Sequence, residues 1–239
     1  MLLGRTRPSG RCRRSEPKDK IFEPPQCEKL IKMFNETEAN PAKAREQQIL
    51  DCAALVFAKH GFRNTDVQEI ADRLAIGKGT IYRHFGSKDS LFLAAVDRGM
   101  QQLDERLKTA RATADDPFAA IKRVVYEYLA FFDENPQFVE LFILERAEFR
   151  DRKKPTYAEY RDANWDEWEA ATKDLMANGR FRKLPVRDIM EVMNNLLYGT
   201  IFTGVFTERD RPMAHQADLI LDIVMNGLLA QKQTGANET

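Results

Sequence analysis

Long hydrophobic runs are missing from this 239-residue sequence, and none approaches the roughly 18 residues of a membrane-spanning helix. The Arg-rich start is not followed by the apolar stretch of about 7–15 residues that a secretion signal carries. Cysteines are few, and Cys12, Cys27 and Cys52 form an odd set without the paired spacing of a zinc site. We therefore expect no membrane contact, no disulfide scaffold and no metal site, in a protein of the reducing cytoplasm.

Residues typical of catalytic sites are also scarce. The only histidines are His60, His84 and His215, and no nucleophile elbow, phosphate loop, HExxH or paired-cysteine motif is present. Catalysis would need a carboxylate-only or cofactor-borne site, and the sequence shows neither. We expect a protein that is not an enzyme and carries no cofactor.

The charge of the chain is balanced overall but not along its length. Lys+Arg and Asp+Glu each number 37, so net charge argues neither for nor against a nucleic-acid partner. Residues 1–20 hold seven basic side chains against Glu16 and Asp19. We predict that residues 1–41 form a flexible basic extension. On one interpretation this extension is a solvated tail, or upstream sequence included by the choice of too early a start. On the other interpretation it is an arm that follows DNA phosphates or enters a minor groove.

The stretch 65–85 has the pattern of two short helices joined by a tight turn. Asp66 is a suitable N-cap, and Glu69 stands where a capping-box partner belongs. The apolar side chains of the first helix follow the i, i+3, i+4, i+7 spacing of one helix face: Val67, Ile70, Ala71 and Leu74. A second helix restarts at Lys78 and runs to Phe85. This arrangement predicts a helix-turn-helix whose second helix enters a DNA major groove.

Donor-rich and aromatic side chains remain on the outward and terminal positions of the second helix. We expect Thr80 and Arg83, with Lys78, to read bases, and the remaining donors to hold phosphates. For Tyr82 and His84 the alternative is that they only pack at the helix end. The predicted DNA-binding residues are Lys78, Gly79, Thr80, Tyr82, Arg83, His84 and Lys88.

This stretch resembles the DNA-binding motif of TetR-type transcriptional regulators. The resemblance rests on Ile70-Ala71, Leu74–Tyr82, His84-Phe85 and Ser87-Lys88, and extends over about 49–96. It implies an effector pocket among the middle helices, and ligand-induced movement of the helix after Ser87 that resets the separation of two recognition helices. The sequence departs from the family at Ala75, where glycine is usual, and at Gly77, where a serine N-cap is usual. Ala75 would cost about 1 kcal/mol if its φ is positive.

The rest of the chain is helical in pattern, without the alternation of β-branched residues that strands require. An amphipathic helix over 43–59 is ended by Gly61 and completes a three-helix DNA-binding unit. Ser87 is the N-cap of a long helix that starts at Lys88. Further helices are expected over 117–133, 136–150, 156–177, 186–206 and 213–232. We predict an all-α fold of about nine helices, with a DNA-binding domain at 42–89 and an effector-binding and dimerisation domain at 90–239.

Most of the aromatic residues lie between Phe118 and Phe206, where packing of a helical bundle is the default use for each. Glu145 and Asn194 each stand on an otherwise apolar helix line. They are either members of an internal ion pair or hydrogen bond, Glu145 with an arginine for instance, or polar anchors for a ligand. Together these residues predict a pocket for a hydrophobic or aromatic small-molecule effector. Its candidate residues are Phe131, Phe138, Phe142, Glu145, Tyr157, Tyr160, Trp165, Trp168, Asn194 and Tyr198.

The last two helices carry an apolar stripe too wide for the core of one monomer. Small residues among them would let helices approach closely, and two copies of each helix would form an intermolecular four-helix bundle. The candidate interface residues are Gly199, Gly204, Ile220, Ile223, Val224 and Gly227. A homodimer also suits DNA, because one short recognition helix makes few base contacts and two half-sites correct that.

The function that the sequence predicts is a ligand-responsive transcriptional regulator, a repressor, that binds a palindromic double-stranded DNA operator as a homodimer. The alternative is an architectural or partner-binding protein that kept the fold without operator specificity. That alternative predicts weak discrimination between sequences and a steep dependence on salt.

Overall fold

The computed structural model describes residues 41–207 and 211–226, which form ten α-helices and one 3-10 helix and include no strand. The predicted all-α fold is thereby confirmed. Residues 1–40 of the predicted basic extension and the predicted interface residue Gly227 lie outside the described residues. Within the described part, no helix is both long and apolar enough to cross a membrane.

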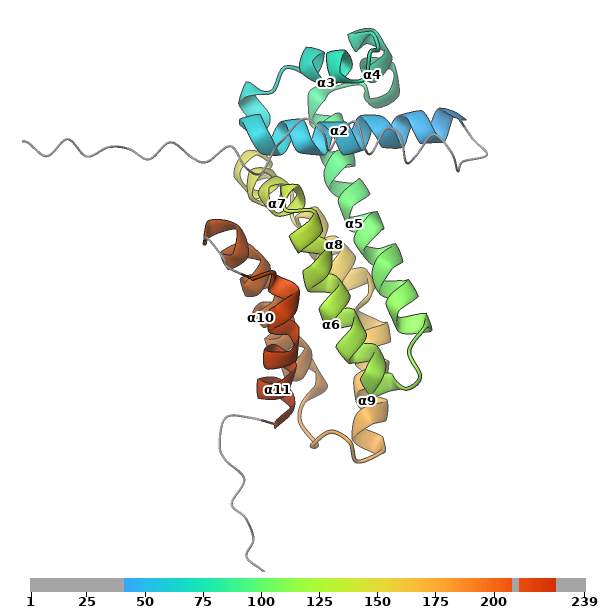
Figure 1. Cartoon of the computed structure of the whole chain (residues 1–239), viewed down its shortest axis with the longest axis vertical. Coiled ribbons are helices and arrows are strands. Elements are labelled where there is room, and N and C mark those ends of the chain that lie inside the picture. Colours follow the sequence, from blue (N-terminus) through green and yellow to red (C-terminus); the bar gives the residue numbers. More distant parts are fainter. Residues whose placement is uncertain (1–40, 208–210, 227–239) are drawn as a thin grey trace, which may run out of the picture.

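A three-helix unit stands at one end of the molecule (Figure 1). Helix α2 (Pro41–Asn64) lies across the body, the short helix α3 (Val67–Arg73) packs on its far side, and α4 (Lys78–Phe85) packs on α3 and on the next helix. Gly61 interrupts α2 with φ 76° and ψ 162°, a conformation that glycine adopts without steric cost, so the regular helix ends where the sequence predicted. The side chains of Ile49, Val56 and Phe57 are fully buried and belong to the hydrophobic core beneath this unit.

Helix α5 (Lys88–Ala112) joins the three-helix unit to the rest of the molecule. Ser87 caps it, since its side chain accepts a hydrogen bond from the Ser90 backbone N–H at 3.0 Å. The helix packs against both α2 and α4, and then runs down the length of the body beside α6 (Pro117–Glu134) (Figure 1). One rigid element therefore touches the helix-turn-helix at one end and the helical body at the other.

The segment 156–177 was expected to be one helix, and that expectation was wrong. It forms two helices, α8 (Thr156–Ala163) and α9 (Trp165–Ala177), after α7 (Gln137–Glu148). The break lies at Asn164, whose side-chain amide donates to the Tyr160 carbonyl oxygen at 3.0 Å. Asparagine side chains compete in this way for the carbonyls of a helix and favour its ends.

The chain closes with α10 (Val186–Phe206), a 3-10 helix η2 (Met213–Gln216) and α11 (Ala217–Asn226). The last expected helix, 213–232, thus starts as a 3-10 turn. The Asp133 carboxylate holds that turn, because it accepts hydrogen bonds from the backbone N–H groups of Met213 and Ala214, both at 2.9 Å. Helices α10 and α11 lie together at one side of the body, beside α6 (Figure 1).

Candidate nucleic-acid interface and ligand cavity

The local geometry of the helix-turn-helix follows from its caps. The Asp66 carboxylate accepts a hydrogen bond from the Gln68 backbone N–H at 2.9 Å and so caps α3, as expected. Glu69 does not complete a capping box, because its carboxylate contacts His60 at 3.3 Å and Arg73 at 2.6 Å instead. In the turn, Ala75 has φ 51°, the left-handed conformation in which glycine is usual. Gly77 is the N-cap of α4 and provides no side-chain hydrogen bond.

Helix α4 turns one face to the core and the other outward. Ile81 is fully buried, and the side chains of Tyr82, Arg83 and His84 are exposed. Thr80 is half-buried at the start of the helix. Of the donors that sequence reasoning assigned to bases and phosphates, Tyr82, Arg83 and His84 are therefore accessible on α4.

Two of the predicted DNA-contacting cations have partners within the chain. The Lys78 ammonium donates to the Asp66 carboxylate at 2.7 Å, and this hydrogen bond is the main reason that the pKa of Asp66 lies below its usual value. The Lys88 ammonium donates to the Arg63 carbonyl oxygen at 3.1 Å and stands 5.1 Å from the centre of the Phe62 ring. Lys88 thus belongs to the junction between α2, α3 and α5, beside the exposed face of α4.

That junction contains residues that the sequence did not single out. Phe57, Phe62, Phe92 and Phe149 form one aromatic cluster with ring centroids 5.1–6.0 Å apart. Beside it, the Arg63 Nε donates to both oxygens of the Glu148 carboxylate, at 3.1 and 2.8 Å. These contacts join positions 85 residues apart in the chain, so no local pattern signals them. They fasten the end of α2 to the end of α7.

A cavity of about 890 Å³ lies in the helical body, lined by residues of α5, α6, α8, α9, α10, α11 and the segment between α9 and α10. This volume is within the range of sites for small organic ligands. Half of the candidate effector residues line it: Tyr157, Tyr160, Trp165, Trp168 and Asn194. The others do not: Phe131, Phe138, Phe142, Glu145 and Tyr198.

The candidates outside the cavity have other places. Phe131, Phe138 and Phe142 are buried in the core between α6, α7 and neighbouring helices. Glu145 is 1 % exposed and forms an internal ion pair with an arginine, the first of the two roles considered for it from the sequence. Its carboxylate lies 2.8 Å from the Arg152 guanidinium and accepts hydrogen bonds from Thr156. Tyr198 is 38 % exposed and lies against Phe202, with ring centroids 4.2 Å apart and ring planes tilted by 35°.

The interior polar groups of the cavity are neutral. The hydroxyls of Tyr128 and Tyr157 share a hydrogen bond of 2.9 Å, and the Tyr157 hydroxyl lies 3.4 Å from the Asn194 amide oxygen. Burial raises the pKa of Tyr157 to about 12 and also raises the pKa of Tyr128 well above its usual value, so both remain protonated donors. Tyr128 was not among the predicted residues, although it stands in the same aromatic-rich segment.

Basic side chains also line the cavity, and sequence reasoning missed them: Lys108, Arg111, Arg161, Arg180 and Arg182. Arg111 lies over the Trp168 ring, 5.8 Å from its centre, and forms an ion pair with Glu167. Isolated basic residues on amphipathic helices, or in a connecting segment as for Arg180 and Arg182, are typical of solvent-facing positions, so nothing in the local sequence marks these five as a group.

The outward faces of α10 and α11 carry large apolar side chains. Among the predicted interface residues, Gly199 and Ile223 are exposed, Gly204 and Val224 are half-buried, and Ile220 is buried in the monomer. Leu219, which belongs to the expected apolar stripe, is exposed as well, and three further exposed apolar residues on α10 were not predicted: Val192, Leu196 and Phe206. On α10, positions 192, 196, 199, 203 and 206 fall on one face of the helix at spacings of three and four.

Comparison with known proteins finds relatives that are helix-turn-helix regulators. Residues 49–95 match the family described as "Bacterial regulatory proteins, tetR family". The chain is 31% identical over 97 residues to the HTH-type transcriptional activator FasR of Mycolicibacterium smegmatis, covering 41% of this chain and 44% of that protein. It is 30% identical over 161 residues to the HTH-type transcriptional repressor KstR2 of Rhodococcus jostii, covering 67% and 65%.

The likeness to solved structures extends over the helical body. The crystal structure of the transcriptional regulator FadR from Bacillus subtilis in complex with stearoyl-CoA superposes with a TM-score of 0.64 at 18% identity, over 76% of this chain and 98% of that one. By sequence, in contrast, the matches span about half the length of the first curated relatives, 44%, 52% and 54%. The family model covers only the helix-turn-helix region, and the likeness of the body to this structure, at 18% identity, is one of fold.

Proposed function

We propose that this chain, which belongs to the TetR-type helix-turn-helix regulators, is a ligand-responsive transcriptional repressor that binds a palindromic double-stranded DNA operator as a homodimer. The observation that carries the proposal is that one helix, α5, starts directly after the exposed recognition helix and ends along the cavity. A small hydrophobic or aromatic effector in the cavity would contact the same rigid element that holds α4. On this view the domain division is 42–89 for DNA and 90–239 for effector and dimer.

Each recognition helix supplies a small set of donors. Arg83 is fully available on the outward face of α4 and suits a bidentate contact with guanine, worth about 1–3 kcal/mol of discrimination. Thr80, at the start of the helix, would stand next to it on the base edges. Tyr82 and His84 flank them and would hold phosphates. Lys78 and Lys88 would have to exchange their present partners for DNA, which favours an electrostatic role for both.

The two halves of α5 have different contacts, and a ligand-induced movement of this helix would act on both. Met100, Leu103 and Arg111 of α5 line the cavity, so a ligand there presses on the lower half of the helix. The upper half packs on α2, which is held separately to α7 by Arg63 and Glu148. Displacement of α5 relative to α7 would therefore tilt the three-helix unit rather than shift it as a whole.

The homodimer would form through α10 and α11. Leu219 is 60 % exposed and Val192 is also 60 % exposed, an unusual state for large apolar side chains on neighbouring helices of one monomer. Leu219→Asp tests this surface in sedimentation velocity, because an exposed position tolerates the substitution in the monomer. The proposal requires that the variant dissociate at concentrations at which the unaltered protein is dimeric.

The DNA-binding proposal is tested by fluorescence anisotropy on DNA from upstream of the protein's own gene, with excess random competitor. Arg83→Ala is expected to abolish competitor-resistant binding, whereas Arg187→Ala, a matched change of an exposed arginine on α10, is expected to leave it intact. Binding that random DNA removes, with both variants behaving alike, on this and other candidate operators would contradict the proposal and favour the architectural alternative.

A further inference from the structure

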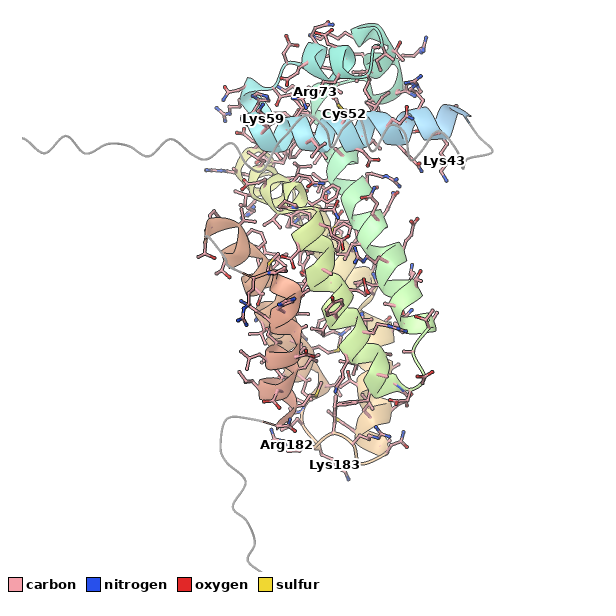
Figure 2. All side chains as sticks on the ribbon, in the orientation of Figure 1. Lys43, Cys52, Lys59, Arg73, Arg182 and Lys183 are labelled. Carbon is pink, nitrogen blue, oxygen red and sulfur yellow. The ribbon has the colours of Figure 1, made fainter. Side chains whose placement is uncertain are left out.

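The two ends of the cavity differ in chemistry. At the end near the middle of the molecule, the hydroxyls of Tyr128 and Tyr157 and the amide of Asn194 are neutral, and Arg161, one turn after Tyr157 on α8, is already paired with Asp162. At the far end, where α9 passes into α10, the lining includes Arg180 and Arg182. Figure 2 shows Arg182, with its neighbour Lys183, at the end of the body remote from α2.

The cavity is elongated along α5. Its lining on this helix runs from Met100 to Arg111, which corresponds to about 16 Å at a rise of about 1.5 Å per residue. Leu103 and Leu107 on α5 and Leu197 on α10 make the wall between the two ends apolar. A rigid compact ligand would leave most of this length empty, whereas a ligand with an extended apolar chain would fill it.

The cations of the lining differ in how fully they are already paired. Lys108 forms an ion pair with Asp104 at 2.6 Å, Arg161 one with Asp162 at 2.6 Å, and Arg111 is paired with Glu167. Neither Arg180 nor Arg182 forms an ion pair with another described residue. Arg180 is close enough to Asp116 only to contribute a weak electrostatic lowering of that carboxyl's pKa.

The acidic residues of the lining do not cancel this charge. Asp104 is occupied by Lys108, and Asp188, in the first turn of α10, is exposed. The lining holds five basic side chains against these two acids. Two unpaired guanidinium groups at the mouth of an apolar channel form a binding site for an anion, because guanidinium makes short, charge-assisted hydrogen bonds to carboxylate and phosphate.

We propose that the effector is an elongated amphiphile, with an apolar chain that lies along α5 and an anionic head group held by Arg180 and Arg182. This inference rests on the proposed function and gives the effector its chemical class. The shared chemistry of the head group is a carboxylate or a phosphate. At the inner end the hydroxyls and the amide are neutral and Arg161 is already paired with Asp162, so an anionic head group placed there would lose its hydration without gaining an unpaired cation among the described residues.

The two tryptophans of the chain provide the assay. Trp165 and Trp168 both line the cavity, and no other tryptophan contributes to the emission. The unaltered protein is titrated with dodecanoate, dodecyl phosphate, dodecanol and dodecylammonium, each below its micellar concentration. We expect the two anions to bind about tenfold more tightly than the alcohol, and the cation to bind more weakly than the alcohol.

Two double variants of equal charge locate the site. Arg180→Gln with Arg182→Gln should bring the anions to within about twofold of the alcohol. Lys183→Gln with Arg187→Gln removes the same charge from exposed neighbours that do not line the cavity, and it should leave the preference for anions in place. A stronger response to carboxylate or to phosphate would support the proposal in either case and would identify the head group.

Three results would overturn the proposal: equal binding of alcohol and anions, loss of the preference in the control double variant, or no change of tryptophan emission with any of the four probes. None of them bears on DNA binding, which the anisotropy assay measures without a ligand. Failure of this inference and failure of the proposed function are therefore distinguishable.

Discussion

The buried carboxylate of Glu145 should be among the most costly side chains to remove from this protein. It is 1 % exposed and accepts hydrogen bonds from the Thr156 backbone N–H at 3.0 Å, the Thr156 hydroxyl at 2.9 Å and the Arg152 guanidinium at 2.8 Å. Thr156 is the first residue of α8, and Pro155 before it offers no side-chain cap. Glu145 therefore substitutes for the missing cap and fixes α8 to α7.

The contacts set the size of the effect. Glu145→Ala leaves a partly buried guanidinium and two buried donors of Thr156 without their acceptor, which should lower the free energy of unfolding by about 3–5 kcal/mol. Glu145→Gln keeps an acceptor for Thr156 and loses only the charge, so it should cost about 1–3 kcal/mol. Glu159 is the matched control, because it pairs with the same Arg152 but is 52 % exposed, and Glu159→Ala should cost at most about 1 kcal/mol.

Urea denaturation at one fixed protein concentration measures these differences, since the stability of the proposed homodimer would depend on concentration. The three variants should keep the slope of the free energy against urea while the midpoint falls. The reasoning is refuted if Glu145→Ala stays within about 1 kcal/mol of the unaltered protein. It is equally refuted if Glu159→Ala is as destabilising as Glu145→Ala.

Three further substitutions test the turn, the core and a helix cap. Ala75→Gly should raise the free energy of unfolding by about 1 kcal/mol in urea denaturation, because Ala75 has φ 51°. Gly99→Ala should lower it: the added methyl group would overlap the buried Phe138 ring, and overpacking of about 1–3 kcal/mol exceeds the gain of about 1 kcal/mol in helix propensity. The Asp116 carboxylate accepts hydrogen bonds from the backbone N–H groups of Ala119 and Phe118 at the start of α6, and these bonds hold the pKa of Asp116 below 3.8. Its contribution to stability is complete above pH 3.8 and is lost as the pH falls through the lower folded value, so thermal melts of Asp116→Asn should converge on those of the unaltered protein in acid.

The helix-turn-helix could be predicted from the sequence because its determinants are local. Asp66, Ser87 and Gly61 act on backbone groups within a few residues of themselves, and the apolar spacing around Ile70 and Ile81 fixes which face is buried. The break at Asn164 carries no glycine or proline. It depends on one side-chain hydrogen bond that competes with helix continuation, so the pattern of 156–177 read as a single helix.

The cavity was only half predictable, for a reason of packing. Phe138 and Tyr157 are both aromatic residues on amphipathic helices, and nothing in their sequence neighbourhoods tells core from cavity wall. Phe138 is core because α7 approaches α5 closely at Gly99, whereas Tyr157 faces the space that α8 leaves open beside α10. Such distances between elements are set by the whole arrangement. The ion pair of Glu145 with an arginine was foreseeable, because a buried carboxylate needs a partner.

Helices α2 and α5 meet at an incompletely satisfied polar contact near the middle of α5. Asp51 of α2 and Arg98 of α5 are each 11 % exposed, and the Arg98 Nε stands 3.5 Å from the Asp51 carboxylate, too far for a good hydrogen bond. This Nε is the one buried side-chain polar atom without a hydrogen-bond partner among the described residues, and burial raises the pKa of Asp51 despite the nearby guanidinium. An unsatisfied group of this kind costs about 1–3 kcal/mol, which is also the usual range of coupling between two binding sites. A small rotation of α5 that improves this contact would recover part of that free energy. We therefore expect the joint between α2 and α5, rather than the recognition helix, to determine how strongly an occupied cavity changes DNA affinity.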